Sequence, residues 1–179
     1  YADKVVARAL KKDKRWGSHD RKFVAETIYE IVRWKRLYVE IAEVKEPFDR
    51  DKIWRIFAVW AVLRGYTLPD WKYFENTPTR KIKGKFDELS KDRKFKESIP
   101  DWMDEIGIKE LGEAIWSKEI KAQNEPAKVI LRTNTIRTNK EALKQELLKL
   151  DIHTTVLPDY PEALELDERA NVFMTDAFK

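Results

Sequence analysis

The sequence has no cysteine, and this absence removes several classes of function at once. Without thiols, the chain offers no disulfide, no cysteine-ligated zinc site and no thiol nucleophile. Its two histidines, His19 and His153, are far apart and fall in different predicted elements, which does not favour a metal pair or a nucleophile–base pair. The five glycines form no Gly-rich strand-to-helix loop, the usual cradle for a dinucleotide, an adenosyl group or a nucleotide phosphate. We therefore find no catalytic constellation in these 179 residues, and expect no metal or cofactor bound to them.

Long apolar runs are missing as well. The longest, residues 56–63, is too short to cross a bilayer, and no signal peptide opens the chain. We therefore expect a cytoplasmic protein with no membrane partner. The chain is 42% hydrophobic and 12% aromatic, which is enough to build a folded core.

The net charge is only +4, but it is unevenly distributed. Residues 1–36 contain eleven Lys and Arg against five Asp and Glu, and residues 78–96 contain eight against three. Residues 151–179 are acidic, with two basic residues against seven acidic ones. The basic segments would attract an anionic polymer, while the simpler alternative is that each is a solvated helix face.

Helical spacing of apolar residues dominates the first two thirds of the chain. Residues 3–12 form an amphipathic pattern, and residues 18–44 predict one long helix with Ser18 or Asp20 as its N-cap. Lys35 would project toward the apolar side of that helix, so either its stem runs along the surface or the helix bends there.

The segment 48–66 is almost entirely apolar in its middle, which predicts the buried central helix of a bundle. Asp49 or Asp51 would cap its start, and Gly65 stands where the residue after the C-cap is expected. Residues 67–98 contain prolines, glycine and many lysines, and predict a loop with one or two short helices.

The stretch SIPDWMDEIG, residues 98–107, predicts a helix with Pro100 at its first position and Gly107 at its end. Another helix follows, and its apolar side would carry Leu111, Ile115 and Trp116.

From Pro126 onward, the spacing of apolar residues changes from the helical pattern to alternation. Apolar and polar residues alternate over residues 129–134, which predicts a strand, and Thr138 with Glu141 predicts a capping box at the start of a helix. Residues 152–158 are again strand-like, and residues 163–166 and 171–178 predict further short strands.

Two parts of the chain resemble known families. Residues 20–41, DRKFVAETIYEIVRWKRLYVEI, resemble the second-helix signature of NusB-like domains. The segment SIPDWMDEIG, followed by NEPAKVILRTNTIRTNKEALKQEL, resembles a junction in the Sun (RsmB-type) family of RNA cytosine carbon-5 methyltransferases. There a Pro-Xaa-Trp helix leads to Pro-Ala and then Leu-Arg-Xaa-Asn-Thr, here Pro126, Ala127 and residues 131–135. Residues 66–97 depart from the family because its Asn-Xaa-Xaa-Leu-Arg helix is missing, so the RNA contacts of that helix are not carried over.

The resemblance implies an α+β chain with two domains: a NusB-like helical bundle over residues 1–122 and a small α/β, ferredoxin- or RRM-like RNA-binding module over residues 123–179. In such proteins a Rossmann-type domain follows, which binds S-adenosylmethionine and supplies two catalytic cysteines. The resemblance therefore implies that this chain is the RNA-binding N-terminal region of an rRNA (cytosine-5) methyltransferase, unable to methylate by itself. Its partners would be RNA and the downstream catalytic domain.

Three groups of residues are candidates for RNA contact: an exposed helix face, a basic run and a strand end. They are Arg33 and Arg36, then Arg80, Lys81, Lys83 and Lys85, then Arg132 and Asn134. For the last pair the structural alternative has equal weight, because a strand-end Arg can pair with Glu and an Asn can bond a turn. Two other functions stay open, a stand-alone NusB-like adaptor without enzymatic activity and an interaction domain that binds no nucleic acid.

Overall fold

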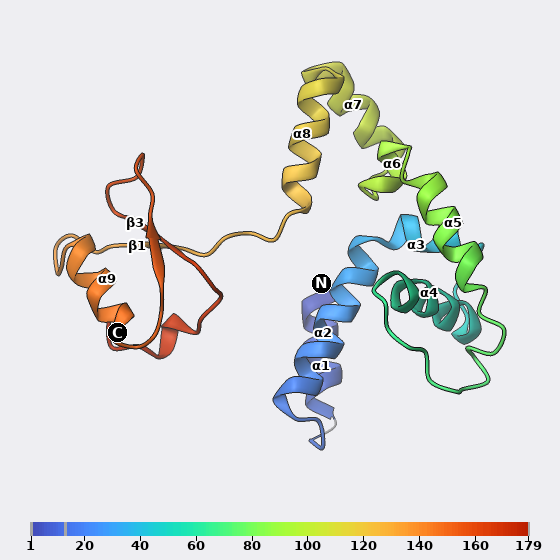
Figure 1. Cartoon of the computed structure of the whole chain (residues 1–179), viewed down its shortest axis with the longest axis horizontal. Coiled ribbons are helices and arrows are strands. Elements are labelled where there is room, and N and C mark those ends of the chain that lie inside the picture. The colour runs from blue at the N-terminus through green and yellow to red at the C-terminus, as the bar shows by residue number, and fades with distance from the viewer. Residues whose placement is uncertain (1, 13, 179) are drawn as a thin grey trace. The chain divides into compact units, whose positions relative to one another are not determined.

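The computed structural model describes residues 2–12 and 14–178. Its contacts divide the chain into two compact units, Tyr1–Asn124 and Glu125–Lys179, which are described separately below. The described part of the first unit is helical, and the second combines a small antiparallel sheet with a helix (Figure 1). The α+β class expected from the sequence is therefore confirmed.

Eight helices make up the described part of the first unit: α1 (Ala2–Lys12), α2 (Ser18–Arg33), α3 (Lys35–Ala42), α4 (Arg50–Leu63), α5 (Thr79–Leu89), α6 (Arg93–Lys96), α7 (Asp101–Leu111) and α8 (Glu113–Asn124). None of the described helices is long and apolar enough to span a membrane. The short helices α5 and α6 confirm the expectation of loop and short helices in residues 67–98.

The long helix expected over residues 18–44 is two helices, because the backbone breaks at Trp34 (φ −99°, ψ 20°). The break comes one residue before Lys35, where the pattern required either a bend or a lysine stem along the surface. The Lys35 ammonium then reaches the carboxylate of Glu46, at 2.6 Å. The N-cap of α2 is Gly17, so the expected Ser18 or Asp20 cap is wrong, although the Asp20 carboxylate accepts a hydrogen bond from the Gly17 N–H.

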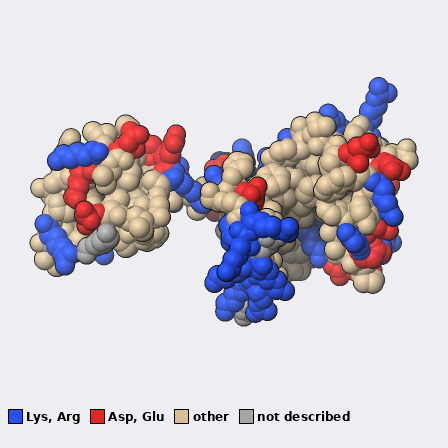
Figure 2. Space-filling view, turned by 90° about the horizontal axis from the view of Figure 1, so that it is seen from below, with Lys and Arg blue, Asp and Glu red and all other residues tan. Residues whose placement is uncertain are grey.

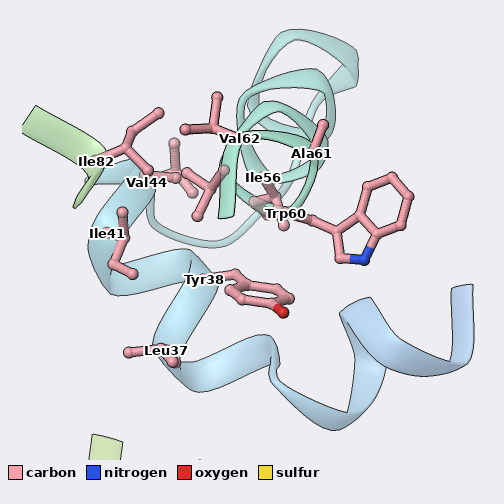
Figure 3. Close-up of a cluster of buried hydrophobic side chains, with 11 residues drawn as sticks. Leu37, Tyr38, Ile41, Val44, Ile56, Trp60, Ala61, Val62 and Ile82 are labelled. Atoms are coloured by element: carbon pink, nitrogen blue, oxygen red, sulfur yellow. The ribbon is translucent and has the colours of Figure 1, made fainter. Parts of the chain in front are cut away.

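The core of the first unit lies between α3, α4 and α5, and it confirms the buried helix expected over residues 48–66. Leu37, Tyr38 and Ile41 of α3 face Ile56 and Trp60 of α4 (Figure 3), and both helices contribute further buried side chains. Asp49 caps α4 by accepting the Lys52 N–H at 2.9 Å, because this amide has no partner within the helix. Burial raises the pKa of the Tyr38 hydroxyl above its ordinary value.

The helix expected to stop at Gly107 continues to Leu111, and Gly112, at φ 76°, ends it. Pro100 is the N-cap and not the first helical residue. Gly107 instead lies in the middle of α7, where a Cβ atom would be 2.2 Å from Cδ2 of Trp116 in α8. Glycine is therefore present because the two helices approach closely there.

Only part of the apolar side expected for the next helix is buried. Trp116 is 7% exposed and packs with Ile99 and Ile120, whereas Leu111 and Ile115 are 44% and 56% exposed. Leu111 is the last residue of α7, so the expectation that it belongs to the same helix as Ile115 and Trp116 is wrong, and the buried side of α8 consists of Trp116 and Ile120.

The second unit contains β1 (Ile130–Arg132), α9 (Lys140–Leu148), β2 (Thr154–Val156), β3 (Ala163–Leu166) and a 3-10 helix, η1 (Val172–Met174). The sheet order is β1-β3-β2, and β3 is antiparallel to both neighbours. The strands expected at residues 129–134, 152–158 and 163–166 are confirmed. The strand expected within residues 171–178 is wrong, since this segment forms η1 and turns.

Leucines from α9 and from the sheet form the core of the second unit. Leu143 and Leu147 pack against Leu164 of β3, which is 0% exposed. The N-cap of α9 is Asn139, whose side chain accepts the Ala142 N–H at 2.8 Å, so the expected capping box at Thr138 is wrong.

Candidate nucleic-acid interface

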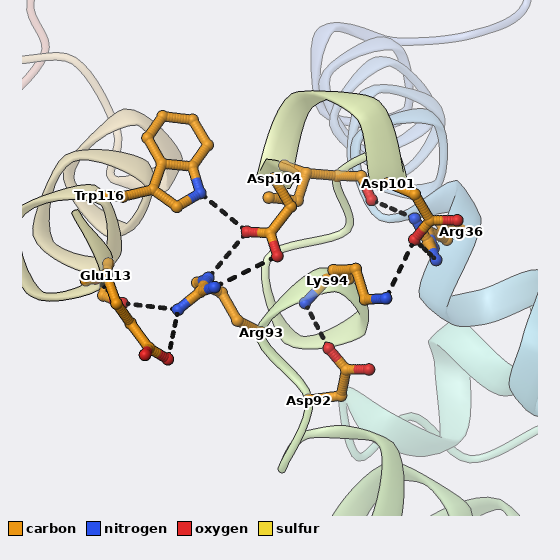
Figure 4. A network of polar contacts seen from close by, with 10 residues as sticks. Arg36, Asp92, Arg93, Lys94, Asp101, Asp104, Glu113 and Trp116 are labelled. Atoms are coloured by element: carbon orange, nitrogen blue, oxygen red, sulfur yellow. Dashed lines mark hydrogen bonds and ion pairs between the residues drawn. The ribbon is translucent and has the colours of Figure 1, made fainter. Parts of the chain in front are cut away.

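The first pair of candidate residues, Arg33 and Arg36, is engaged inside the helical unit. Arg33 donates to the Glu97 carbonyl at 3.2 Å, and Arg36 donates to the Ile99 carbonyl at 2.5 Å. Arg36 also pairs with the carboxylate of Asp101 at 2.8 Å (Figure 4). These bonds hold the end of α2 and the start of α3 against the segment that leads into α7. An RNA contact by these two arginines stays a prediction, in competition with this structural role.

A partly buried ion pair, in which the carboxylate is the buried member, lies next to that contact. Arg93 of α6 binds both carboxylate oxygens of Asp104 in α7, at 2.8 and 3.2 Å, and the Trp116 indole N–H donates to the same carboxylate at 2.8 Å (Figure 4). The hydrogen bond from Arg93 holds the pKa of Asp104 below its ordinary value, although burial opposes this shift. An aspartate kept ionised by two donors suits the joining of three helices better than proton transfer.

The basic run on α5 is divided between paired and unpaired residues. Lys81 and Lys85 each lie 2.6 Å from the carboxylate of Glu43, and their hydrogen bonds lower the pKa of Glu43 to about 2. Arg80 and Lys83 are exposed and have no acidic partner among the residues that the structure describes. Of the four basic residues in this run, Arg80 and Lys83 are therefore the two that can bind an external anion without first leaving an ion pair.

At the end of β1, the candidate residues Arg132 and Asn134 make the two structural contacts that the sequence analysis weighed against RNA binding, an ion pair with a glutamate and a hydrogen bond in a turn. Arg132 pairs with Glu162 at 2.9 Å, and the Asn134 side chain accepts the Ile136 N–H at 3.2 Å in the turn that follows. The side chain of Arg132 is nevertheless 85% exposed, so it still faces solvent. A role of Arg132 and Asn134 in reading nucleotides stays a prediction.

A further basic surface lies on α1, which the sequence analysis marked as basic without selecting its residues. On α1 and in the turn that follows it, five exposed cations have no acidic partner among the described residues; they are Lys4, Arg8, Lys11, Lys12 and Lys14. We call these five residues the α1 basic surface. Figure 2 shows Lys and Arg gathered where α1 and the start of α2 lie, with little acid among them. The spacing 4, 8, 11 and 12 was the available signal, since it places four cations on one helix face.

The α1 basic surface is held in place by apolar packing and by one arginine. Val6, on the other side of α1, is 6% exposed, so the helix is anchored opposite its cations. Arg21 of α2 donates to the carbonyls of Leu10 and Trp16, both at 2.9 Å, and so satisfies an oxygen at the end of α1. A row of exposed cations that have no acidic partner in the described part of the chain suits the binding of phosphates.

One family model matches part of this chain, and one solved structure is similar to it in fold. A family model described as the ferredoxin-like domain of RsmF/B-like methyltransferases matches residues 99–173, that is α7, α8 and most of the second unit. The crystal structure of PH0851 has a similar fold, with a TM-score of 0.58 and 19% sequence identity. The alignment covers 96% of this chain but only 45% of PH0851, so the chain spans less than half the length of that protein. No curated protein matches the chain.

Proposed function

We propose that this chain is the RNA-binding N-terminal region of an S-adenosylmethionine-dependent rRNA (cytosine-5) methyltransferase of the Sun (RsmB-type) family. The observation that carries the proposal is the match of residues 99–173 to the ferredoxin-like domain of RsmF/B-like methyltransferases. The likeness in fold to PH0851 over nearly the whole chain supports a bundle and a module that occur together in one longer protein. The NusB-like identity of the bundle belongs to the same proposal, and it rests on the pattern of residues 20–41.

Methyl transfer requires a cofactor site and, in this family, two cysteines, and this sequence has no cysteine. In the proposal both are supplied by a Rossmann-type domain beyond these 179 residues, and that domain binds S-adenosylmethionine. The gene should then continue past residue 179 with a Gly-rich strand–turn–helix and at least two Cys codons. A stop codon directly after residue 179 would contradict this part and favour a stand-alone RNA-binding adaptor.

The RNA contact is assigned first to the α1 basic surface. Each phosphate that is neutralised releases counterions, so the logarithm of the affinity falls by about 0.7 to 0.9 per contact for each tenfold rise in salt. Five contacts would give a slope of roughly −3.5 to −4.5, and on the order of 10²-fold weaker binding at 200 mM than at 50 mM salt. Contacts of this kind position RNA without selecting its sequence.

Fluorescence anisotropy with a labelled RNA hairpin, at several salt concentrations, tests this assignment. The variant Lys4→Gln/Arg8→Gln/Lys11→Gln removes three charges while keeping good helix formers, and it should flatten the slope by roughly 2 to 3. The matched control is Lys45→Gln/Lys91→Gln/Lys118→Gln, which removes three exposed charges that have no acidic partner among the described residues. Equal effects of the two variants would mean that RNA responds only to net charge.

Sequence preference is assigned to the strand end. Arg132→Ala or Asn134→Ala should change the ranking of different RNA loops while leaving the salt slope almost unchanged, because bases and not phosphates would be read there. Charge reversal of Arg33 or Arg36 is a poorer test, since it would also break their bonds to the Glu97 and Ile99 carbonyls.

A further inference from the structure

Two connecting segments meet at one end of the small sheet. The turn after β1, residues 133–138, and the loop between β2 and β3, residues 157–162, lie at the same end because β3 is antiparallel to both of its neighbours. The Thr133 N–H donates to the Glu162 carbonyl at 2.8 Å, and the Arg132 guanidinium pairs with the Glu162 carboxylate at 2.9 Å. These two contacts join the segments into one surface, which we call the sheet-end surface.

Each of the two segments presents one large side chain to solvent. Ile136 in the turn is 95% exposed, more than any other large hydrophobic residue in the described part of the chain, and Tyr160 in the loop is 64% exposed. A side chain that remains in water gains little from the hydrophobic effect. The core of the second unit therefore does not account for an isoleucine and a tyrosine at these positions.

Backbone hydrogen bonds hold both side chains at fixed positions. The Asn134 carbonyl accepts the Arg137 N–H at 3.0 Å, and the Asn134 side chain accepts the Ile136 N–H at 3.2 Å, so the turn is closed around Ile136. The Tyr160 carbonyl accepts the Ala163 N–H at 3.0 Å, directly before β3. Side chains that leave an ordered backbone lose less entropy when they bind a partner, which makes the pair suited to recognition.

The charges around these two side chains favour an anionic partner. Arg137 is exposed and Lys140 half-buried, and neither has an acidic partner among the described residues. Residues 132–140 and 157–162 contain three basic and two acidic residues, and one of the acids, Glu162, is already paired with Arg132. Cations next to an exposed tyrosine and isoleucine suit a phosphodiester chain whose bases are unpaired, because paired bases expose no face for stacking.

We propose that the sheet-end surface binds an unpaired nucleotide of RNA. Tyr160 stacks on the base, Ile136 packs against it, and Arg137 neutralises the adjoining phosphate. This inference rests on the proposed function, since it requires that the chain binds RNA, and it adds the structural class of RNA that is preferred. A protein partner fits less well, because an apolar protein surface would leave the charge of Arg137 without a counterion.

Two RNA hairpins that differ by one base test the inference on the whole chain. One carries a single bulged nucleotide, and the other carries an abasic residue at the same position. Both have the same phosphates, so the α1 basic surface should bind them equally. Fluorescence anisotropy should show that the chain binds the hairpin with the bulged base about tenfold more tightly, which is typical of one base stacked on an aromatic ring.

The variants locate the base contact. Tyr160→Ala/Ile136→Ala should bind the two hairpins alike, with an unchanged affinity for the abasic one, whereas Tyr160→Phe should keep the preference because it keeps the ring. Tyr29→Ala/Ile115→Ala is the matched control, since it removes a tyrosine and an isoleucine of the first unit that are 45% and 56% exposed. The control should keep the tenfold preference.

The outcomes separate this inference from the proposed function. Equal affinity of the unsubstituted chain for the two hairpins would overturn the inference alone, and would favour a protein as the partner of Ile136 and Tyr160. A preference that survives in Tyr160→Ala/Ile136→Ala, or that is also lost in the control variant, would overturn it as well. If neither hairpin binds, the proposed function and the inference are both wrong.

Discussion

Replacing Gly107 with alanine should destabilise the helical unit, although alanine is the better helix former. Gly107 lies inside α7, and an added Cβ would be 2.2, 2.3 and 2.7 Å from three carbons of the Trp116 ring. The indole cannot easily move, because it is 7% exposed and its N–H is bound to Asp104 at 2.8 Å. The two helices must therefore separate, or the Asp104 contact must break.

The magnitude follows from two opposing effects. Alanine in a helix interior is favoured over glycine by about 0.5–1 kcal/mol. Overpacking of a filled interior costs about 1–3 kcal/mol, and contact with a fixed ring places Gly107→Ala at the upper end of that range. We expect a net loss of about 2–2.5 kcal/mol in the free energy of unfolding.

Gly84 provides the matched control, because it lies inside α5 and an added Cβ there has no atom within 4 Å. Gly84→Ala should raise the free energy of unfolding by about 0.5–1 kcal/mol, so the two variants should differ in sign. Urea unfolding followed by far-ultraviolet circular dichroism measures both. If Gly107→Ala is as stabilising as Gly84→Ala, the close approach of α7 and α8 is wrong.

Three further predictions concern single polar contacts. Asp104→Ala should lower the free energy of unfolding by about 3 kcal/mol or more, since Arg93 and the Trp116 N–H lose a buried acceptor; exposed Glu105→Ala is the control in the same urea assay. Asn139→Ala should cost about 1 kcal/mol, and Thr138→Ala clearly less, because Asn139 is the N-cap of α9; equal losses would restore the capping box. The pKa of Glu43 is lowered from 4.5 to about 2, so its stabilising contribution is complete above pH 4.5 and is lost as the pH falls toward 2. Urea unfolding between pH 2 and 6 should show a weaker pH dependence for Glu43→Gln, and an unchanged one would exclude this ion pair as a cause.

Local signals in the sequence were sufficient for the class and for most elements. Apolar spacing located α1, α4 and α9, alternation located β1, and Asp49 was one of the two residues expected to cap α4. Each of these depends on residues within one or two turns of each other, which is the range over which helix and strand periods act. The change of period near Pro126 also matched a real change of architecture.

The role of Gly107 and the pairing of β1 depend on residues that are far away in the sequence, so the local pattern could not predict them. Gly107 has the appearance of a helix stop, yet it is needed because Trp116 of another helix lies against it. The ladder partner of β1 is likewise some thirty residues away, so an open edge is visible only in the folded sheet.

The candidate site shows the same division between sequence and structure. The sequence by itself determined that the chain is basic near its start and in residues 78–96, and that it contains no cysteine chemistry. Only the tertiary structure decided which cations are neutralised, because Glu43 meets Lys81 and Lys85 from 38 and 42 residues away. Arg36 pairs with Asp101, which is 65 residues away in the sequence. The spacing of residues along a helix or strand cannot predict a contact at that separation. The α1 cations keep their charge because folding brings no carboxylate among the described residues to them.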